Sequence, residues 1–97
     1  MKTKIVENGE VLTIVISKNK IEYLDIYNNL HRKSGPAIKS PKSKFEAWCL
    51  RGNLHREDGP ALINYQGIKS YYLNGNEVHK SEIDQYICSR RIKKLRE

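Results

Sequence analysis

Long apolar runs are missing from this sequence, and cysteine is scarce. The first residues, MKTKIVENGEVLTIVIS, hold no uninterrupted apolar stretch and no cleavage site, so we expect no signal peptide. No other segment is apolar for long enough to span a membrane. Only Cys49 and Cys88 are present, far apart, whereas small secreted domains usually carry a disulfide framework. These absences predict a cytoplasmic protein without membrane attachment.

A chain of 97 residues also has little material for a deep active site. It predicts a single domain, 1–97, with a thin core, because a domain this small buries only about 60–70% of the surface of its unfolded chain. Function is therefore expected on a surface, in a groove or at a self-association face. No complete catalytic motif is present, which favours a protein that is not an enzyme and needs no cofactor. A metal-independent ribonuclease using His with Lys and Tyr remains an open alternative.

Metal ligands at chelating distances along the chain are absent as well. His31, His55 and His79 are spaced 24 residues apart, which is not the spacing of a His or Cys chelate. The sequence therefore predicts no metal site. Cys49 lies between Trp48 and Leu50 on a predicted strand, which is typical of a small core residue rather than of a nucleophile.

Acidic residues are outnumbered: 11 Asp and Glu stand against 18 Lys and Arg, a formal charge of +7. Such an excess favours an acidic partner, although it also serves solubility alone. The cations gather in two stretches. The first stretch is residues 32–56, in which Glu46 is the only acidic residue, and the second is the C-terminal tail. The tail cations are Arg90, Arg91, Lys93, Lys94 and Arg96.

An internal repeat is the strongest signal. LHRKSGPA at 30–37 and LHREDGPA at 54–61 agree at six of eight positions with an offset of 24, and Val-His-Lys at 78–80 continues the register. Aromatic residues follow it in part: Trp48 and Tyr72 are 24 apart, whereas Ala47 interrupts the series Tyr23, Ala47, Tyr71. Periodicity of this kind indicates stacked units, none of which buries its apolar face alone.

Each unit reads as two short strands and two turns. Ser34-Gly35 and Asp58-Gly59 are turn dipeptides in which we expect Gly to adopt a positive φ, and the proline that follows suits the start of a strand. Asn8-Gly9 between apolar runs predicts a hairpin over 1–19. The fold class is therefore mainly β, an antiparallel meander of tandem hairpin repeats over 20–80.

The tail departs from this pattern. Ser81 is placed to cap a helix, with Asp84 three residues later as a weak capping box. Apolar residues then recur at helical spacing. They are Ile83, Tyr86, Ile87, Ile92 and Leu95. We expect an amphipathic helix over 81–96, within a basic C-terminal region 81–97, that covers the open end or face of the sheet.

The segment GNLHREDGPA at 52–61, preceded by an aromatic strand, resembles the His-Arg-x-Asp-Gly-Pro-Ala repeat of bacteriophage and giant-virus proteins. That repeat is loosely similar to MORN repeats, whose regular Tyr/Gly spacing is missing here. The resemblance covers about residues 23–80, with Lys33-Ser34 departing from it. It implies a phage protein built of short hairpins. By association, it implies an accessory protein that binds and inhibits host factors, including defence systems.

The two His-Arg pairs, His31-Arg32 and His55-Arg56, have two interpretations. As functional residues they form a repeated anion-binding element, because Arg offers a planar fork to phosphate or carboxylate and imidazole adds a donor. As structural residues they bond turn carbonyls and pair with Asp58, and so maintain the repeat. The tail cations are likewise either a binding site or a solvated helix end near the C-terminal dipole.

Three functions follow from these features. The first is a non-enzymatic viral protein that binds the acidic surface of a host protein, a defence or nucleic-acid-handling protein, and inhibits it. The second is direct nucleic-acid binding through the tail cations and the 32–56 loops. The third is sequestration of a phosphorylated nucleotide at the His-Arg turns. The sheet edges of a short array would also allow a homodimer.

Overall fold

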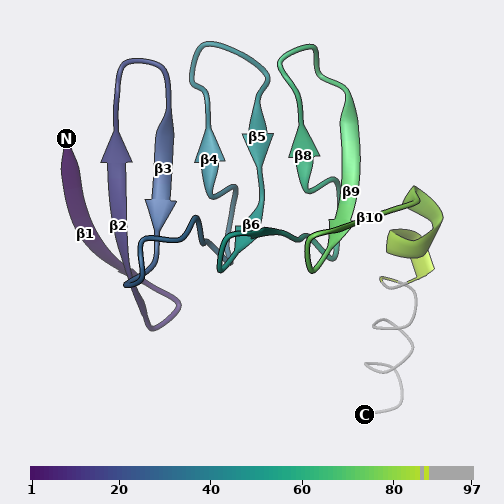
Figure 1. The fold of residues 1–97 in the computed structure, drawn as a ribbon, viewed down its shortest axis with the longest axis horizontal. Helices are drawn as coiled ribbons and strands as arrows, with labels where there is room; N and C mark the ends of the chain where they lie inside the picture. Colours follow the sequence, from purple (N-terminus) through teal and green to yellow (C-terminus); the bar gives the residue numbers. More distant parts are fainter. Residues whose placement is uncertain (86, 88–97) are drawn as a thin grey trace.

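The computed structural model describes residues 1–85 and 87, which form an antiparallel β structure with one short helix (Figure 1). Eight strands make one sheet in the order β1-β2-β3-β4-β5-β8-β9-β10, and β6 pairs only with β7. This confirms the predicted mainly β meander. The strands are β1 (Lys2–Glu7), β2 (Glu10–Ile16), β3 (Ile21–Leu24), β4 (Ile38–Lys39), β5 (Glu46–Ala47), β6 (Cys49–Leu50), β7 (Asn53–Leu54), β8 (Leu62–Ile63), β9 (Lys69–Leu73) and β10 (Asn76–Val78).

The N-terminal hairpin forms as its turn predicts. Asn8 and Gly9 have φ of 53° and 78°, the left-handed pair that a two-residue hairpin turn requires. Glu7 and Glu10 face each other across this turn, at the end of the β1–β2 ladder. The turn therefore presents two carboxylates on one face of the sheet, because directly paired residues share a face.

Small side chains make the core. Ala37, Ala47 and Cys49 are buried, and partly buried hydrophobic residues pack against them. These are Leu30, Ile38, Phe45, Leu54 and Leu62. The molecule measures 45 × 34 × 19 Å, so much of its apolar surface stays near solvent. Such a thin structure offers faces and edges rather than a closed cavity.

The aromatic series is continuous, contrary to the strict 24-residue register. Tyr23 O accepts a hydrogen bond from His31 N, and Trp48 O accepts one from His55 N, both at 2.9 Å. Trp48, not Ala47, is therefore the counterpart of Tyr23. The register shifts by one residue because the β6–β7 turn is shorter than the turn after β3.

The helix begins one residue earlier than predicted, and Ser81 is not its cap. Residues 80–85 and 87 are helical, and His79 precedes them. The Nδ1 of His79 accepts from Ser81 N at 3.2 Å, so His79 supplies the capping acceptor. Ile83, 1% exposed, holds the helix in place. In Figure 1 the helix lies beside β10, at the end of the sheet.

The rest of the predicted helix lies outside the described residues. This includes the candidate binding residues Arg90, Arg91, Lys93 and Lys94, and also Cys88. In the part that is described, no helix combines the length and the apolar character that crossing a membrane requires.

Candidate functional site

His31 joins two repeats through buried hydrogen bonds. The side chain is 2% exposed; its Nδ1 accepts from Arg51 N at 3.0 Å, and its Nε2 lies 3.0 Å from Glu10 Oε2. Because Nδ1 accepts, the proton is on Nε2, and the neutral imidazole donates to the Glu10 carboxylate. The imidazole thus fastens the turn of the next repeat to the N-terminal hairpin.

His55 makes the corresponding bond one repeat later. Its Nδ1 accepts from Asn74 N at 2.9 Å. Arg51 and Asn74, the two donors, both adopt a left-handed conformation, with φ of 50° and 52°. These contacts support the structural interpretation of the His-Arg pairs, with one correction: the histidines accept from a turn N–H and do not bond turn carbonyls.

Each Arg of a His-Arg pair lies between an aromatic ring and a glycine. The Cζ atoms of Arg32 and Arg56 lie 3.9 and 3.8 Å from the ring centroids of Tyr23 and Trp48. On the other side of Arg56, a Cβ placed on Gly59 would lie 2.9 Å from Cζ.

Gly35 is related in the same way to Arg32, where a Cβ would lie 2.9 Å from Nη1. Neither Gly35 nor Gly59 has a positive φ, so the expectation that these turns need a left-handed glycine is wrong. The repeat has glycine here because the guanidinium leaves no room for a side chain.

The same arginines are ion-paired. Arg32 Nε and Nη2 donate to the Glu7 carboxylate at 3.0 and 3.3 Å. Arg56 Nε donates to Asp58 Oδ1 at 3.0 Å, which confirms the predicted pair, and its Nη1 donates to Pro60 O at 3.2 Å. Both guanidinium groups are therefore largely committed to internal partners.

A charged cluster surrounds His31. Asp25 is 3% exposed and accepts from Tyr27 N and Arg51 Nη1 at 2.8 and 2.9 Å. Glu10 accepts from His31 and also pairs with Arg51 and Lys33, each at 3.3 Å. Four of the cations predicted to form a basic surface over 32–56 are thus neutralised: Arg32, Lys33, Arg51 and Arg56.

These contacts hold three carboxyl groups in the ionised form. The hydrogen bond from Arg32 lowers the pKa of Glu7, and the hydrogen bond from His31 lowers the pKa of Glu10. For Asp25, burial alone would raise the pKa, but hydrogen bonds from the Asn29 backbone and from Arg51 outweigh it and leave the pKa lowered.

Acid should therefore unfold the protein by protonating these groups. A carboxyl whose folded pKa is depressed stabilises the fold above its ordinary pKa, and this contribution is lost as the pH falls through the folded pKa. We expect the urea midpoint to be constant near neutral pH and to fall below about pH 4.5, the ordinary glutamate value. Glu7→Gln should lower the midpoint at pH 7 and flatten its fall in acid. Glu77→Gln, on an exposed position of β10, is the control. Equal slopes for the two variants would contradict the assignment.

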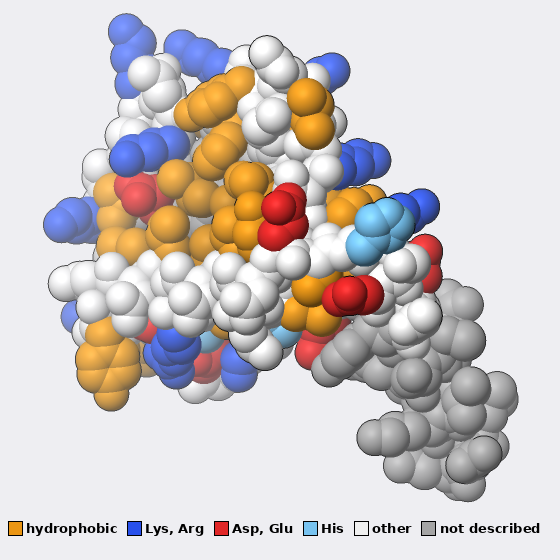
Figure 2. Space-filling view, turned by 45° about the vertical axis from the view of Figure 1, so that its right-hand side comes forward, with side chains coloured by type: hydrophobic (Ala, Val, Ile, Leu, Met, Phe, Trp, Pro, Cys, Tyr) orange, Lys and Arg blue, Asp and Glu red, His pale blue; other side chains and the backbone are white. Residues whose placement is uncertain are grey.

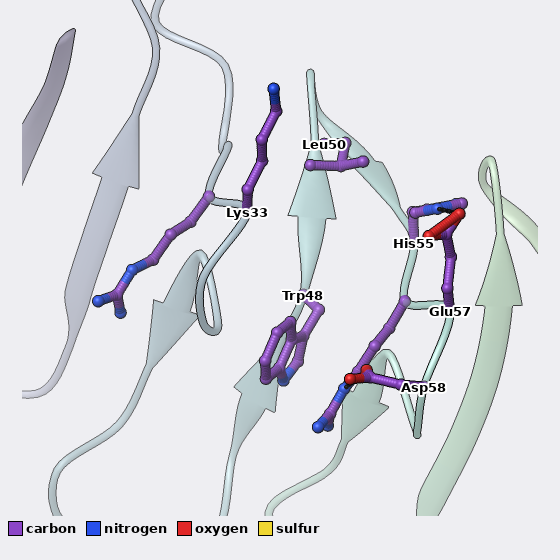
Figure 3. Close-up of a pocket in the computed structure, with 8 residues that line it drawn as sticks. Lys33, Trp48, Leu50, His55, Glu57 and Asp58 are labelled. Carbon is purple, nitrogen blue, oxygen red and sulfur yellow. Dashed lines mark hydrogen bonds and ion pairs between the residues drawn. The ribbon is translucent and has the colours of Figure 1, made fainter. Parts of the chain in front are cut away.

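A groove of ≈ 420 Å³ separates the two repeats on the side of the Arg-aromatic stacks. Arg32 and Lys33 line it from one repeat, residues 55–58 line it from the next, and Trp48 and Leu50 lie between them (Figure 3). We call it the inter-repeat groove. The structure thus brings three of the predicted site residues together, Arg32, His55 and Arg56, and leaves His31 outside. The Nε1 of Trp48 is buried and has no hydrogen-bond partner within the described residues.

Lysines lie along one side of the sheet, where the strands end in hairpin tips. The hairpin tips that join β2 to β3, β4 to β5 and β8 to β9 lie side by side along this edge (Figure 1). Lys18 and Lys20 occupy the first tip, and Lys42 and Lys44 occupy the same repeat positions in the second. These four residues define the lysine edge. Lys20 pairs with Glu22 at 3.4 Å, whereas the other three have no ion pair within residues 1–85 and 87.

The third tip is apolar instead. Tyr65 is 68% exposed and Ile68 is 58% exposed. The ring of Tyr65 stacks on Phe45 at 4.8 Å, and the aliphatic chain of Lys44 lies against Gly67, where a Cβ would come within 2.9 Å of Cδ. The lysines therefore border an exposed aromatic and aliphatic spot.

Comparison with known protein families, with curated proteins and with solved structures finds no match to this chain. No cluster of three or more His, Cys, Asp or Glu side chains suited to a metal occurs among the described residues. Cys49 is buried, and burial raises the pKa of its thiol to about 11, so the group is a core residue in the protonated form.

Proposed function

We propose that this protein is a non-enzymatic binding protein that docks on an acidic surface of a partner protein through the lysine edge. One observation carries the proposal. The described arginines pair with carboxylates of the fold, whereas Lys18, Lys42 and Lys44 are exposed at the hairpin tips and have no acidic partner among the described residues. Unpaired lysines on one edge steer and orient an acidic partner.

The surroundings of the lysine edge support a protein partner over a nucleic acid. At the third tip, exposed Ile68 stands at the repeat position of Lys44, beside Tyr65 and before exposed Lys69, so the edge combines apolar and basic side chains. Figure 2 shows apolar side chains gathered in the middle of one face, with Lys and Arg around its margin. An apolar centre with a charged rim is the usual composition of a protein interface.

The resemblance to phage repeats supports a more specific role, namely an accessory protein that inhibits a host protein. The small core and the open inter-repeat groove of the described residues are consistent with inhibition by docking. The tail cations would add attraction to the same acidic partner.

The double variant Lys42→Glu/Lys44→Glu should weaken partner binding by about tenfold or more, because two attractive charges at the interface rim become repulsive. Lys2→Glu/Lys4→Glu is the matched control: it makes the same change of charge on exposed positions of β1. The measurement is capture from bacterial host lysate with nuclease, at low and high salt, followed by the Kd of the purified partner.

A protein retained by the wild type and by the Lys2/Lys4 control, but lost by the Lys42/Lys44 variant, supports the proposal. Equal retention by the two variants would contradict it. Capture of nucleic acid alone, lost on raising the salt, would replace it with the nucleic-acid alternative, because phosphate binding weakens steeply with salt.

A further inference from the structure

The two repeats differ at only two positions of an otherwise identical octad, and both differences change the charge. Lys33-Ser34 in the first repeat corresponds to Glu57-Asp58 in the second. The identical residues form the joints between repeats, through the His, Arg and Gly contacts above. The positions that differ have ion-pair partners of their own, Glu57 with His55 among them, but their side chains stay partly exposed, 35% for Glu57.

Both differing positions border the same groove. Lys33 lines one wall of the inter-repeat groove, and Glu57 and Asp58 line the other (Figure 3). The Lys33 side chain is 56% exposed while its Nζ lies 3.3 Å from Glu10, and the Asp58 side chain is 68% exposed while it pairs with Arg56. The walls therefore present a cation and a carboxylate to solvent across one depression.

The floor of the groove suits an extended chain. Trp48, which lies between β5 and β6, and Leu50 in β6 both line the groove and form an apolar strip between the walls. The buried Nε1 of Trp48 is an unsatisfied donor at this floor, and such groups are concentrated at functional sites.

We propose that the inter-repeat groove binds a peptide segment of the partner protein that presents an acidic side chain to Lys33 and a basic side chain to Glu57 and Asp58. This inference rests on the proposed function and assigns the groove its specificity. A nucleotide fits less well, because its phosphates would meet the carboxylates of Glu57 and Asp58 on one wall.

Trp48 is the only tryptophan of the chain and lies on the floor of the groove, so its fluorescence reports occupancy directly. The probes are a short series of blocked peptides in which glycines separate Glu from Arg, the same peptides with Gln at both positions, and ATP. We expect a saturable change with the Glu/Arg peptide of best spacing. The Gln peptide and ATP should bind about tenfold more weakly or not at all.

The variant Lys33→Gln/Asp58→Asn removes both wall charges but keeps an amide oxygen that can accept from Arg56. It should weaken binding of the Glu/Arg peptide by about tenfold, with an unchanged circular dichroism spectrum. Lys2→Gln/Asp84→Asn, which neutralises one exposed cation and one exposed anion outside the groove, should bind as the wild type does.

Equal binding of the Glu/Arg and Gln peptides, no saturable signal for any spacing, or tighter binding of ATP would each overturn the groove assignment. None of these readouts involves Lys42 or Lys44. Suppose that the groove variant loses peptide binding while Lys42→Glu/Lys44→Glu binds the partner as the wild type does. This result would contradict the proposed docking edge and still support the groove assignment.

Discussion

His31→Ala should destabilise the protein by about 3–4 kcal/mol, a large part of the stability of a domain this small. The imidazole is 2% exposed and satisfies two groups at once, the Arg51 N–H and the Glu10 carboxylate. Its removal leaves a buried N–H without an acceptor and opens a cavity beside the first repeat.

The other two histidines at the same repeat position, His55 and His79, allow a comparison of the stability lost on replacement by alanine. His55→Ala should cost about 1–2 kcal/mol, because its side chain accepts one comparable bond but is 13% exposed. His79→Ala should cost about 0.5–1 kcal/mol, the value of an exposed helix cap.

The measurement is urea unfolding at pH 7, followed by Trp48 fluorescence and circular dichroism. His31→Asn is the informative partial replacement, since its Oδ1 can occupy the position of Nδ1 and accept from Arg51; it should recover part of the loss. Similar losses for all three alanine variants would show that His31 is not the joint that its contacts indicate.

Local signals in the sequence were enough to predict the β meander and its N-terminal hairpin. Asn8-Gly9 specifies its own hairpin, because both residues tolerate left-handed backbone conformations. The paired octads likewise predict a repeated unit, and the structure shows that unit with the same His and Arg contacts in both copies. These features depend on residues close together in the chain.

Contacts between residues far apart in the chain could not be predicted from local sequence signals. Glu7 pairs with Arg32 across 25 residues and Glu10 accepts from His31 across 21, separations over which sequence spacing carries no information on contact. One signal was present: these two glutamates are the only acidic residues of the N-terminal hairpin, and both lie at its turn. The predicted basic surface over 32–56 was too broad for this reason.

The groove was also beyond sequence reasoning, although its residues had been singled out. The sequence left Arg32, His55 and Arg56 open as anion-binding or as structural residues, and the opposite charges of Lys33 and Glu57 gain meaning only when the repeats lie side by side. The difference between the octads is visible in the sequence as a departure of Lys33-Ser34 from the repeat. Its position on facing walls is a property of the fold.

Gly59→Ala should cost about 2 kcal/mol in the wild type and should be neutral, or stabilising by about 0.5 kcal/mol, in an Arg56→Ala background. The new Cβ would lie 2.9 Å from Arg56 Cζ, and that guanidinium already stacks on Trp48 at 3.8 Å, so neither group can yield without losing the stack. Without the guanidinium no such contact remains.

The backbone conformation of Gly59 explains why Gly59→Ala changes from destabilising to stabilising when Arg56 is removed. Gly59 has no positive φ, so alanine is not strained there and lowers the entropy of the unfolded chain. A double-mutant cycle by urea unfolding should therefore give a coupling of about 2 kcal/mol between positions 56 and 59. The same double-mutant cycle at Arg32 and Gly35, the equivalent pair of the first repeat, tests the prediction a second time. An equal cost of Gly59→Ala in both backgrounds would mean that glycine serves the turn conformation, and that the Arg-Gly contact is incidental to the repeat.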